Sequence, residues 1–383
     1  MQNMHKQMSD YSFVEISSSA LRHNWQVFRN LLPTNIKMAA VIKANAYGHD
    51  QLLVQTILED LVDFWQVDSL RELQLVRQTS NKPALLLGFV PSEQLAQAVD
   101  LQGTLALYDL EKLRQLDAIG QQKNTIVPVH IKIDALFGRQ GLLIEQLPEF
   151  LTVAKKHPQV RITGFYAHYA EADDPSAITH TQQQLRTFHQ AKEIFATFGY
   201  QDLVSHISAT AGILSQEVEH PEHSLVRLGV GLYGLWPSQE LKVAWQDTIQ
   251  LEPALRWVSM IAQVKAVPTG FPIGYGATVI TQRETKIAIV PVGYADGFDR
   301  GLTNCGEVLV RGQRCAVLGR VSMNMIIVDV SDLSAVQVED EVVLLGKQNE
   351  VEITATEIAD KIGTINYEIT TRISPLLGRK QIA

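Results

Sequence analysis

Short apolar runs rich in β-branched residues alternate with longer amphipathic segments through the first two thirds of the chain. Runs of this length are typical of buried strands, and apolar residues at helical spacing are typical of the helices that cover them. Helix signals include Pro91 at the start of residues 91–99, the segment 109–120, and residues 17–33 before the first strand. We expect eight strands, over residues 38–44, 63–69, 83–89, 103–109, 127–134, 162–170, 203–209 and 225–234.

Eight β/α repeats fit a closed parallel sheet better than an open one. We therefore predict an α/β fold, with a (β/α)8 TIM-type barrel over residues 12–250. An open, doubly wound sheet is the alternative. The segment after the first strand, KANAYGHD at residues 43–50, lacks the glycine fingerprint of a dinucleotide site.

The pattern changes at about residue 251, where apolar and polar residues alternate and tight turns separate the runs. Of the later segments, only residues 354–363 carry a helical pattern. A mostly-β C-terminal domain is predicted for residues 251–383.

Composition narrows the class of protein. Of the 383 residues, 46% are hydrophobic and 19% are charged, which is ordinary for a globular chain. The net charge of −8 makes nucleic acid and anionic membranes poor partners. Two cysteines exclude a disulfide framework and a cysteine-based zinc site, and we expect no metal. With no long apolar span and a polar N-terminus, we expect a cytoplasmic protein.

In a parallel barrel, reactive groups gather at the C-terminal ends of the strands. Lys43 leaves the apolar run AAVI there, and an amine in such a place suits attack on a carbonyl carbon, although a solvated lysine also fits. Arg227 lies in an equally apolar strand and needs an acceptor, either a structural carboxylate or a ligand. The other strand-end candidates are Lys132, Arg139, Tyr166, His168 and Thr210.

Seven segments resemble the motifs of the alanine racemases and occur in the same order as in that family, over residues 12–375. They are AAVIKANAYGHD, GFYAHYA, VRLGVGLYG, PIGYGATV, VGYADGFDR, GRVSMNM and INYEI. The resemblance implies a barrel followed by a β domain. It also implies a pyridoxal 5'-phosphate-dependent isomerase that interconverts L- and D-alanine and supplies D-alanine for the peptidoglycan of the cell wall.

The resemblance implies two catalytic bases. Lys43 would bind the cofactor and act on one face of the substrate carbon, and Tyr275 would act on the other face. Because Tyr275 would come from a second subunit, a homodimer with shared active sites is expected. Arg227 would contact the pyridine nitrogen, and His168 would link it to Tyr275, stabilising a tyrosinate. Read alone, a histidine in a strand or a tyrosine between two glycines also fits a core or a turn.

The remaining positions follow from the same motifs. Arg139 and Met323 would meet the substrate carboxylate, Lys132 would be a carbamylated lysine that pairs with Arg139, and Tyr294 would form an inner gate with Tyr367. Tyr166 is a supporting residue. Read alone, Met323 also fits core packing. The phosphate group would be held by Tyr47, Thr210, Gly229, Val230 and Tyr367.

Several positions depart from the family pattern, and they put the substrate range in doubt. A racemase acting on serine or on several amino acids is therefore an alternative. A decarboxylase of the same fold fits the PIGYG and VGYADG segments less well, and a cofactor carrier would need neither the β domain nor Tyr275 as a second base. The departures are Ala135, Leu136, Phe137, Ala209, Leu228 and Asn324.

Overall fold

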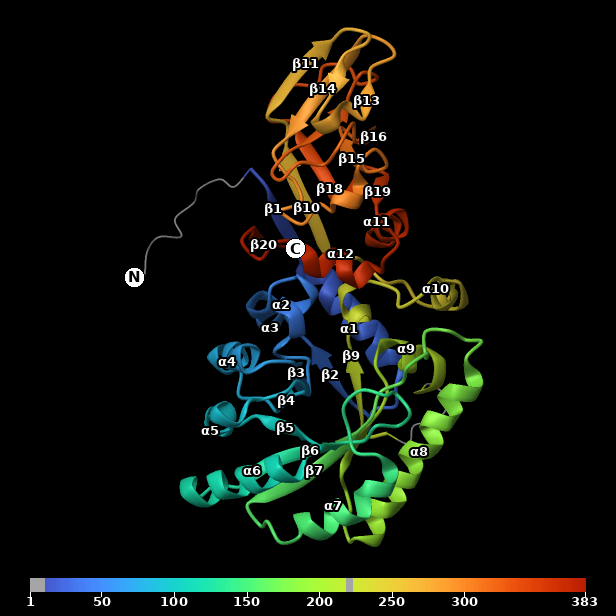
Figure 1. The fold of residues 1–383 in the computed structure, drawn as a ribbon. Coiled ribbons are helices and arrows are strands. Elements are labelled where there is room, and N and C mark those ends of the chain that lie inside the picture. The colour runs from blue at the N-terminus through green and yellow to red at the C-terminus, as the bar shows by residue number, and fades with distance from the viewer. Residues whose placement is uncertain (1–10, 218–222) are drawn as a thin grey trace. The chain divides into compact units, whose positions relative to one another are not determined.

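The computed structural model describes residues 11–217 and 223–383, which fall into two compact units (Figure 1). The first, which we call the barrel unit, comprises residues 21–46, 51–217 and 223–252. The second, the β unit, comprises residues 11–20, 47–50 and 253–383.

Eight parallel strands form one sheet of the barrel unit, in the order β8-β7-β6-β5-β4-β3-β2-β9. The sheet is almost closed, because Ala209, just after β8, bridges Arg227 of β9 in parallel. The predicted eight-stranded barrel is thereby confirmed. Its strands are β2 (Lys37–Val41), β3 (Phe64–Val67), β4 (Ala84–Leu86), β5 (Thr104–Leu107), β6 (Val127–Lys132), β7 (Val160–Tyr166), β8 (Val204–His206) and β9 (Leu225–Leu228).

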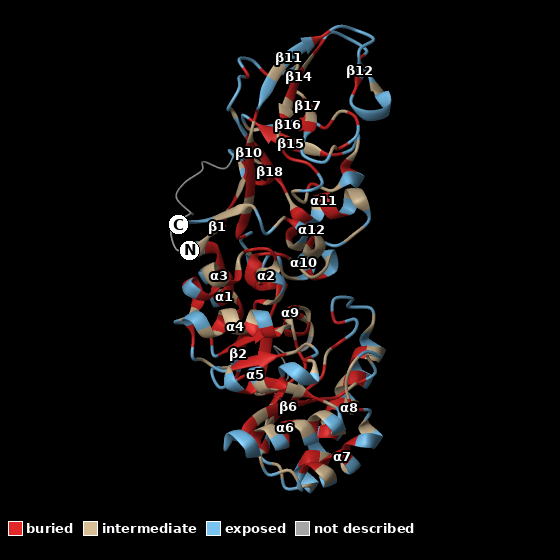
Figure 2. Cartoon of the chain, turned by 60° about the vertical axis from the view of Figure 1, so that its left-hand side comes forward, coloured by how far each residue is buried: buried red, intermediate tan, exposed pale blue. Residues whose placement is uncertain are grey.

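Helices between the strands cover the barrel, and Figure 2 shows its strands as largely buried. Local signals fix the helix ends: Ser69 and Glu72 form a capping box at the start of α4, and Asp109 caps α6. The helices of this part of the chain are α1 (Ser18–Leu31), α3 (Gln51–Leu58), α4 (Leu70–Thr79), α5 (Leu95–Asp100), α6 (Leu110–Lys123), α7 (Leu147–Ala154), α8 (Ile178–Thr197), α9 (Thr210–Gly212) and α10 (Gln239–Trp245).

The inner side of the barrel changes from apolar to polar along the strands. Ala39, Phe64 and Leu225 pack together in one buried cluster. Since side chains alternate along a strand, Arg227 faces the same side as Leu225, two residues closer to the C-terminal end. Polar side chains therefore occupy the end of the lumen at which the sequence predicts the site.

The β unit contains three sheets. The seven-stranded sheet has the order β16-β15-β18-β10-β1-β20, with β19 paired to β18; the others are β11-β14-β17 and β12-β13. The strands are β1 (Phe13–Ser17), β10 (Leu255–Met260), β11 (Gln263–Val267), β12 (Pro272–Ile273), β13 (Val279–Ile280), β14 (Thr285–Val290), β15 (Glu307–Val310), β16 (Gln313–Ala316), β17 (Ile326–Asp329), β18 (Glu341–Gln348), β19 (Val351–Ile353) and β20 (Gly378–Ile382).

Two features of the β unit differ from the expectations. Strand β1 pairs with β10 and β20, so residues 13–17 belong to the β unit, whereas the sequence predicts a barrel domain that begins at residue 12. The alternating pattern of β1 buries Val14 and Ile16 on the inner face of this sheet. The prediction of a single late helix is wrong: α11 (Ala355–Ile362) is followed by α12 (Asn366–Arg372). Helix α12 has only seven residues and no side-chain cap, so its sequence signal is weak.

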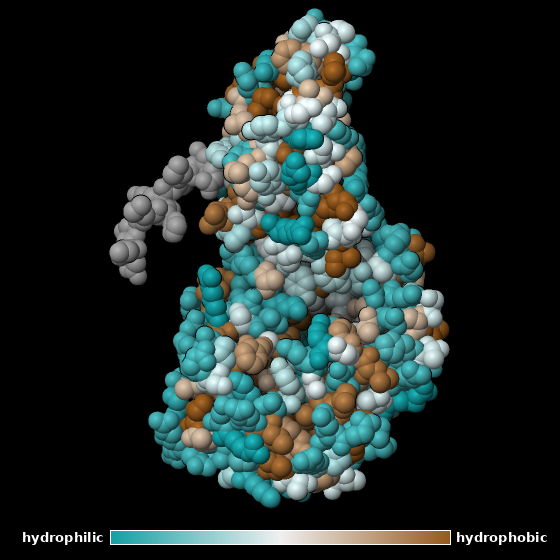
Figure 3. All heavy atoms as spheres, in the orientation of Figure 1, coloured by the Kyte–Doolittle hydropathy of each residue, from teal (hydrophilic) through white to brown (hydrophobic). Residues whose placement is uncertain are grey.

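No helix in the described part of the chain is both long and apolar enough to cross a membrane. The face of the protein shown in Figure 3 carries hydrophilic residues with hydrophobic ones scattered among them. The two cysteines, Cys305 and Cys315, are both free thiols.

Candidate active site

Lys43 directly follows β2, at the C-terminal end of the strand, as the sequence predicts. Residues 44–46 then take left-handed backbone conformations, with φ of 52°, 54° and 54°. Each left-handed residue other than glycine costs about 1–2 kcal/mol, so contacts around the turn must hold it. Ala44 N donates a hydrogen bond to Glu72 Oε1 at 2.7 Å. The segment labelled α2 (Lys43–Tyr47) is therefore a strained turn that fixes where the Lys43 side chain begins.

Arg227 is 4% exposed, and its two terminal nitrogens are tightly held. Nη1 donates to His206 Nδ1 at 2.6 Å and to the His206 carbonyl at 3.3 Å. Nη2 lies 2.9 Å from Ala167 O, 2.7 Å from Ile207 O and 3.0 Å from His168 Nδ1. Arginine can only donate, so all five atoms are acceptors. Imidazoles and carbonyls thus hold the guanidinium in one plane.

The histidines around Arg227 are neutral. Burial, followed by the charge of Arg227, lowers the pKa of His130 to about 3 and the pKa values of His168 and His206 well below the usual value. Each neutral ring carries one proton. Since Nδ1 of His206 accepts from Arg227, its Nε2 donates to His130 Nδ1 at 2.9 Å. By the same reasoning, the proton of His168 is on Nε2.

Lys132 ends β6 and is 7% exposed. Burial lowers the pKa of its amine to about 8, and the charges of Arg139 and Arg227 add to the effect. The charge of Lys43 also contributes to lowering the pKa of Lys132, which indicates that the two amines face the same region. Gln140 Oε1 accepts a long hydrogen bond of 3.4 Å from Lys132 Nζ.

Arg139 lies on a loop that one carboxylate organises. Asp134 accepts hydrogen bonds from the backbone N–H groups of Phe137, Gly138 and Arg139, at 2.8, 3.0 and 3.1 Å. Leu136 has φ of 61° and a side chain that is 52% exposed. A leucine therefore occupies a left-handed position that glycine would adopt without strain.

Thr210, Gly229 and Val230 lie together, as predicted. Thr210 Oγ1 accepts hydrogen bonds from Gly229 N and Gly231 N, at 3.1 and 3.2 Å. Val230 begins a 3-10 turn over Val230–Tyr233. A Cβ on Gly231 would lie 2.6 Å from the Phe28 ring and 2.7 Å from Thr210 Cγ2, so glycine is required for this close approach.

Tyr166 brings into the lumen a polar group for which the described residues provide no hydrogen-bond partner. Its hydroxyl is buried, and it finds no hydrogen-bond partner in the described part of the chain. Its ring lies parallel to that of His206, with centroids 5.0 Å apart. Burial raises the pKa of the phenol, so the hydroxyl stays protonated and is able to donate.

The β unit carries the remaining predicted residues, and two pairs of them lie close together. Tyr294 N donates to Ser322 O at 3.1 Å and Ala295 N to Met323 O at 3.0 Å, so the segments of Tyr294 and Met323 are adjacent. The rings of Tyr47 and Tyr367 have centroids 6.2 Å apart.

Tyr275 is largely exposed. It lies on a turn between Gly274 and Gly276, whose φ values are 65° and 72°, and it is 70% exposed. Both glycines adopt a conformation that other residues reach only with strain. The turn presents the phenol of Tyr275 outward from the β unit.

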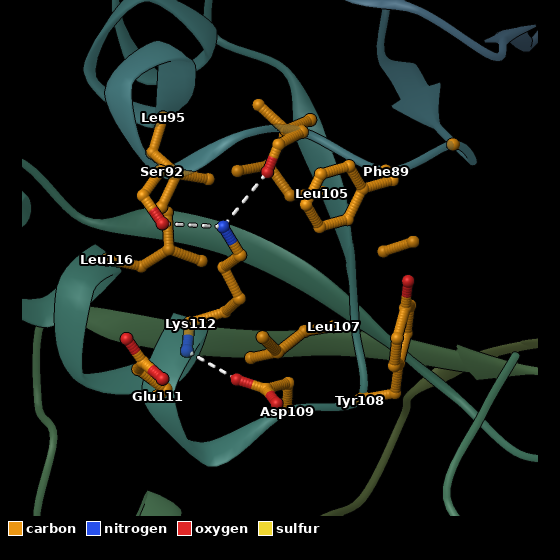
Figure 4. Close-up of a pocket in the computed structure, with 13 residues that line it drawn as sticks. Phe89, Ser92, Leu95, Leu105, Leu107, Tyr108, Asp109, Glu111, Lys112 and Leu116 are labelled. Carbon is orange, nitrogen blue, oxygen red and sulfur yellow. Dashed lines mark hydrogen bonds between the residues drawn. The ribbon is translucent and has the colours of Figure 1, made fainter.

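A cavity of about 210 Å³ lies beside the C-terminal end of β5 (Figure 4). Lys112 crosses it, and its Nζ donates to Val90 O at 3.1 Å and to Ser92 Oγ at 2.9 Å. No predicted site residue lines this cavity. Among the described residues, no group of three or more His, Cys, Asp or Glu side chains is arranged to hold a metal ion.

Two family models match the chain. The model of the alanine racemase N-terminal domain matches residues 16–237, and that of the alanine racemase C-terminal domain matches residues 254–381. The chain belongs to the alanine racemase family. This confirms the family and the enzyme class, an amino-acid racemase, that the motifs predicted.

Individual alanine racemases are similar over almost their whole length. That of Citrifermentans bemidjiense is 37% identical over 368 residues, covering 94% of this chain and 96% of the relative. Among solved structures, the alanine racemase of Clostridium difficile 630 has a TM-score of 0.91 and 31% identity, covering 98% and 97% of the two chains. The structure from Bacillus anthracis has a TM-score of 0.91 and 32% identity, covering 99% and 96%.

Sequence reasoning missed His130 and His206, which together with Arg227 form a hydrogen-bonded row in the lumen. A signal was present for one of them: His130 lies two residues before Lys132 on β6 and so faces the same side of the strand. Tyr108 was also missed, and its charged form would raise the pKa of Tyr166, so it lies near the mouth of the barrel.

Proposed function

We propose that this member of the alanine racemase family is a pyridoxal 5'-phosphate-dependent alanine racemase. It would interconvert L- and D-alanine in the cytoplasm and supply D-alanine for peptidoglycan. The observation that carries the proposal is Lys43, an amine at the C-terminal end of a barrel strand, which faces the same region as Lys132. Relatives named alanine racemase, at 31–38% identity over nearly the whole chain, support it.

The barrel residues fit the chemistry of this cofactor. Lys43 offers a primary amine for an aldehyde, and the Thr210 hydroxyl with the backbone of Gly229 and Val230 suits a phosphate group. Within residues 11–217 and 223–383, the buried hydroxyl of Tyr166 has no acceptor, so it is able to donate to a ligand. When bound, pyridoxal phosphate supplies an electron-accepting ring that acidifies the α-carbon of an amino acid. The family assigns Tyr47 and Tyr367 to the phosphate as well.

Arg227 would set the character of the ring. Its guanidinium remains protonated and only donates, so a ring nitrogen facing it stays unprotonated. Nη1 and Nη2 are fixed by five acceptors, which also fixes the direction of the Nε–H bond in the same plane. A weaker electron sink suits racemisation, in which transamination and decarboxylation must be suppressed.

Two bases would move the proton at the α-carbon. Lys43 would act on one face and Tyr275 of a second subunit on the other, because one base reaches both faces only by moving around the substrate. The proton of His168 is on Nε2, so this nitrogen is able to donate to a tyrosinate oxygen of Tyr275. The exposed position of Tyr275 is consistent with a homodimer that shares its sites.

Arg139 and the backbone of Met323 would bind the substrate carboxylate. Lys132 would be carbamylated: its pKa of about 8 leaves part of the amine neutral near neutral pH, and a neutral amine adds carbon dioxide with release of a proton. The carbamate would bring a negative charge beside Arg139. Tyr294 and Tyr367 would form a gate that favours small substrates.

A broader amino-acid racemase is the second candidate, because Phe137 packs on Arg139 with its ring centroid 4.3 Å from Cζ. This aromatic contact lies at one of the positions that depart from the family pattern. Initial rates for alanine and serine distinguish the two functions. If serine is racemised faster than alanine, the preferred substrate is serine and the proposal of an alanine racemase is wrong.

The mechanism is tested by proton exchange in deuterated solvent. Tyr275→Phe should slow racemisation by about 10²–10⁴-fold in both directions. It should still exchange the α-proton of D-alanine through Lys43, whereas exchange from L-alanine nearly stops. Equal exchange from both enantiomers would refute the two-base assignment. Borohydride reduction should attach the cofactor to Lys43, and attachment to another lysine would refute that assignment.

A further inference from the structure

One buried side chain of α8 joins two segments that carry site residues. Gln184 is 0% exposed. Its Nε2 donates to Ala135 O at 2.8 Å and to His168 O at 3.1 Å, and its Oε1 accepts from Ala170 N at 2.9 Å. Both donor protons and the carbonyl oxygen of the amide are therefore used, and all three bonds lead out of the helix.

The two joined segments meet again through an aromatic ring. Ala135 belongs to the loop that ends at Arg139, and His168 follows β7. The Phe137 ring lies 4.3 Å from Arg139 Cζ and 5.6 Å from the His168 ring. Gln184 thus joins the backbones of the two segments whose side chains, Arg139 and His168, both contact Phe137.

The loop needs such support because Leu136 is left-handed. A second contact comes from one turn earlier on α8, on the same face of the helix. His180 Nε2 lies 3.1 Å from Leu136 O, and His180 Nδ1 lies 2.7 Å from Glu171 Oε2. Gln184 and His180 therefore contact the carbonyls of the two peptide units that flank the strained residue Leu136, Ala135 O and Leu136 O.

We propose that Gln184 is a positioning residue of the active site. By bonding Ala135 O and His168 O at once, it places Arg139 and His168 so that both act on the same bound amino acid. This inference rests on the proposed function, in which Arg139 binds the substrate carboxylate and His168 supports the second base. It assigns the role to a side chain that touches neither substrate nor cofactor.

Gln184→Met tests the proposal, because it keeps the length of the side chain and removes all three hydrogen bonds. Displacing a substrate-binding group by about 1 Å costs on the order of 10²-fold in rate. We expect kcat/KM for alanine to fall by about 10–10²-fold, with most of the change in KM, because Arg139 would bind the carboxylate. The control is Gln183→Met, at the exposed neighbouring position of the same helix, which should leave KM unchanged.

A second measurement follows the loop itself. Amide hydrogen exchange at Phe137, Gly138 and Arg139 should be faster in Gln184→Met than in wild type, without substrate present. Gln183→Met should exchange as wild type does. A general loss of structure would accelerate exchange throughout the barrel, whereas a positioning role confines the change to this loop and the segment after β7.

If Gln184→Met does not fold, Gln184→Glu is the second variant. An ionised glutamate accepts from Ala170 N but donates to neither carbonyl, whereas its protonated form donates to one. KM should therefore be raised and should fall again at low pH, unlike that of Gln183→Glu.

Unchanged KM and unchanged exchange in a folded Gln184 variant would overturn the proposal. A wild-type chain without racemase activity would count against the proposed function alone, because loop exchange still decides whether Gln184 holds the loop.

Discussion

Replacing Arg227 by lysine should separate the geometry of this side chain from its charge. The four N–H bonds of Nη1 and Nη2 are shared among five acceptors. Three of the residues that provide these acceptors are 0% exposed: Ala167, His206 and Ile207. A lysine amine has three N–H bonds. At least two acceptors therefore lose their donor, at about 1–3 kcal/mol each. The free energy of unfolding should fall by about 2–6 kcal/mol, a large share of the roughly 5–15 kcal/mol of a typical protein.

The assay is urea unfolding of the cofactor-free protein, followed by fluorescence, together with racemisation of L-alanine by the reconstituted enzyme. Arg283→Lys is the matched control, because Arg283 and its partner Asp332 have side chains 59% and 82% exposed. An exposed pair of this kind contributes at most about 1 kcal/mol. If Arg227→Lys lost no more stability than Arg283→Lys and racemised at the wild-type rate, the reasoning from orphaned acceptors would be refuted.

Three further predictions concern assembly, Lys132 and His180. Mixing Lys43→Ala and Tyr275→Phe subunits should restore one intact site per heterodimer, and no recovery in a mixture shown by native mass spectrometry to exchange subunits would contradict shared sites. With ¹³C-labelled bicarbonate, wild type should show a carbamate NMR signal that Lys132→Met lacks, and its absence from wild type would exclude carbamylation. The hydrogen bond to Glu171 raises the pKa of His180 above its usual 6.5, so the pair stabilises the fold fully below that value and the contribution is lost as pH rises through the raised pKa. At pH 6 the free energy of unfolding of wild type should therefore exceed that of Glu171→Gln by about 0.2–1 kcal/mol, the range for an exposed pair. This difference should disappear by pH 9. A difference that does not change with pH would exclude the His180–Glu171 pair as its cause.

The architecture of the barrel could be predicted because each of its strands carries its own signal. Every predicted apolar run overlaps one strand of the sheet, although the strands are shorter than the runs and β2 and β7 begin one and two residues before theirs. The runs overshoot because residues just beyond the end of a strand, such as Ile42 after β2, remain buried. Helix α11 was predicted for a similar reason, since Thr354 and Gly363 provide recognisable caps at its ends. Periodicity and capping are local properties, so the sequence displays them directly.

Other features of the site depend on contacts that no local pattern shows. The left-handed turn after Lys43 includes two alanines, which disfavour that conformation, and Glu72 of α4 helps to hold it. Gln184 reads as one of three consecutive glutamines in a helix, and only the fold distinguishes it from its exposed neighbour Gln183. Motifs identify residues that meet a ligand, whereas the residues that hold them in place carry no motif of their own.

Arg227 also shows how a buried charge is kept effective. A carboxylate partner would satisfy the guanidinium and cancel its field, whereas the acceptors of Nη1 and Nη2 are neutral imidazoles and carbonyls. The field therefore extends to the mouth of the barrel, where it helps to lower the pKa of Lys132 to about 8 and that of His168 well below its usual value. One arginine thus supplies a fixed donor and at the same time helps to keep nearby bases unprotonated. A proton-transfer site near neutral pH requires such bases, and the three histidines bonded to or beside Arg227 are what allow its charge to remain.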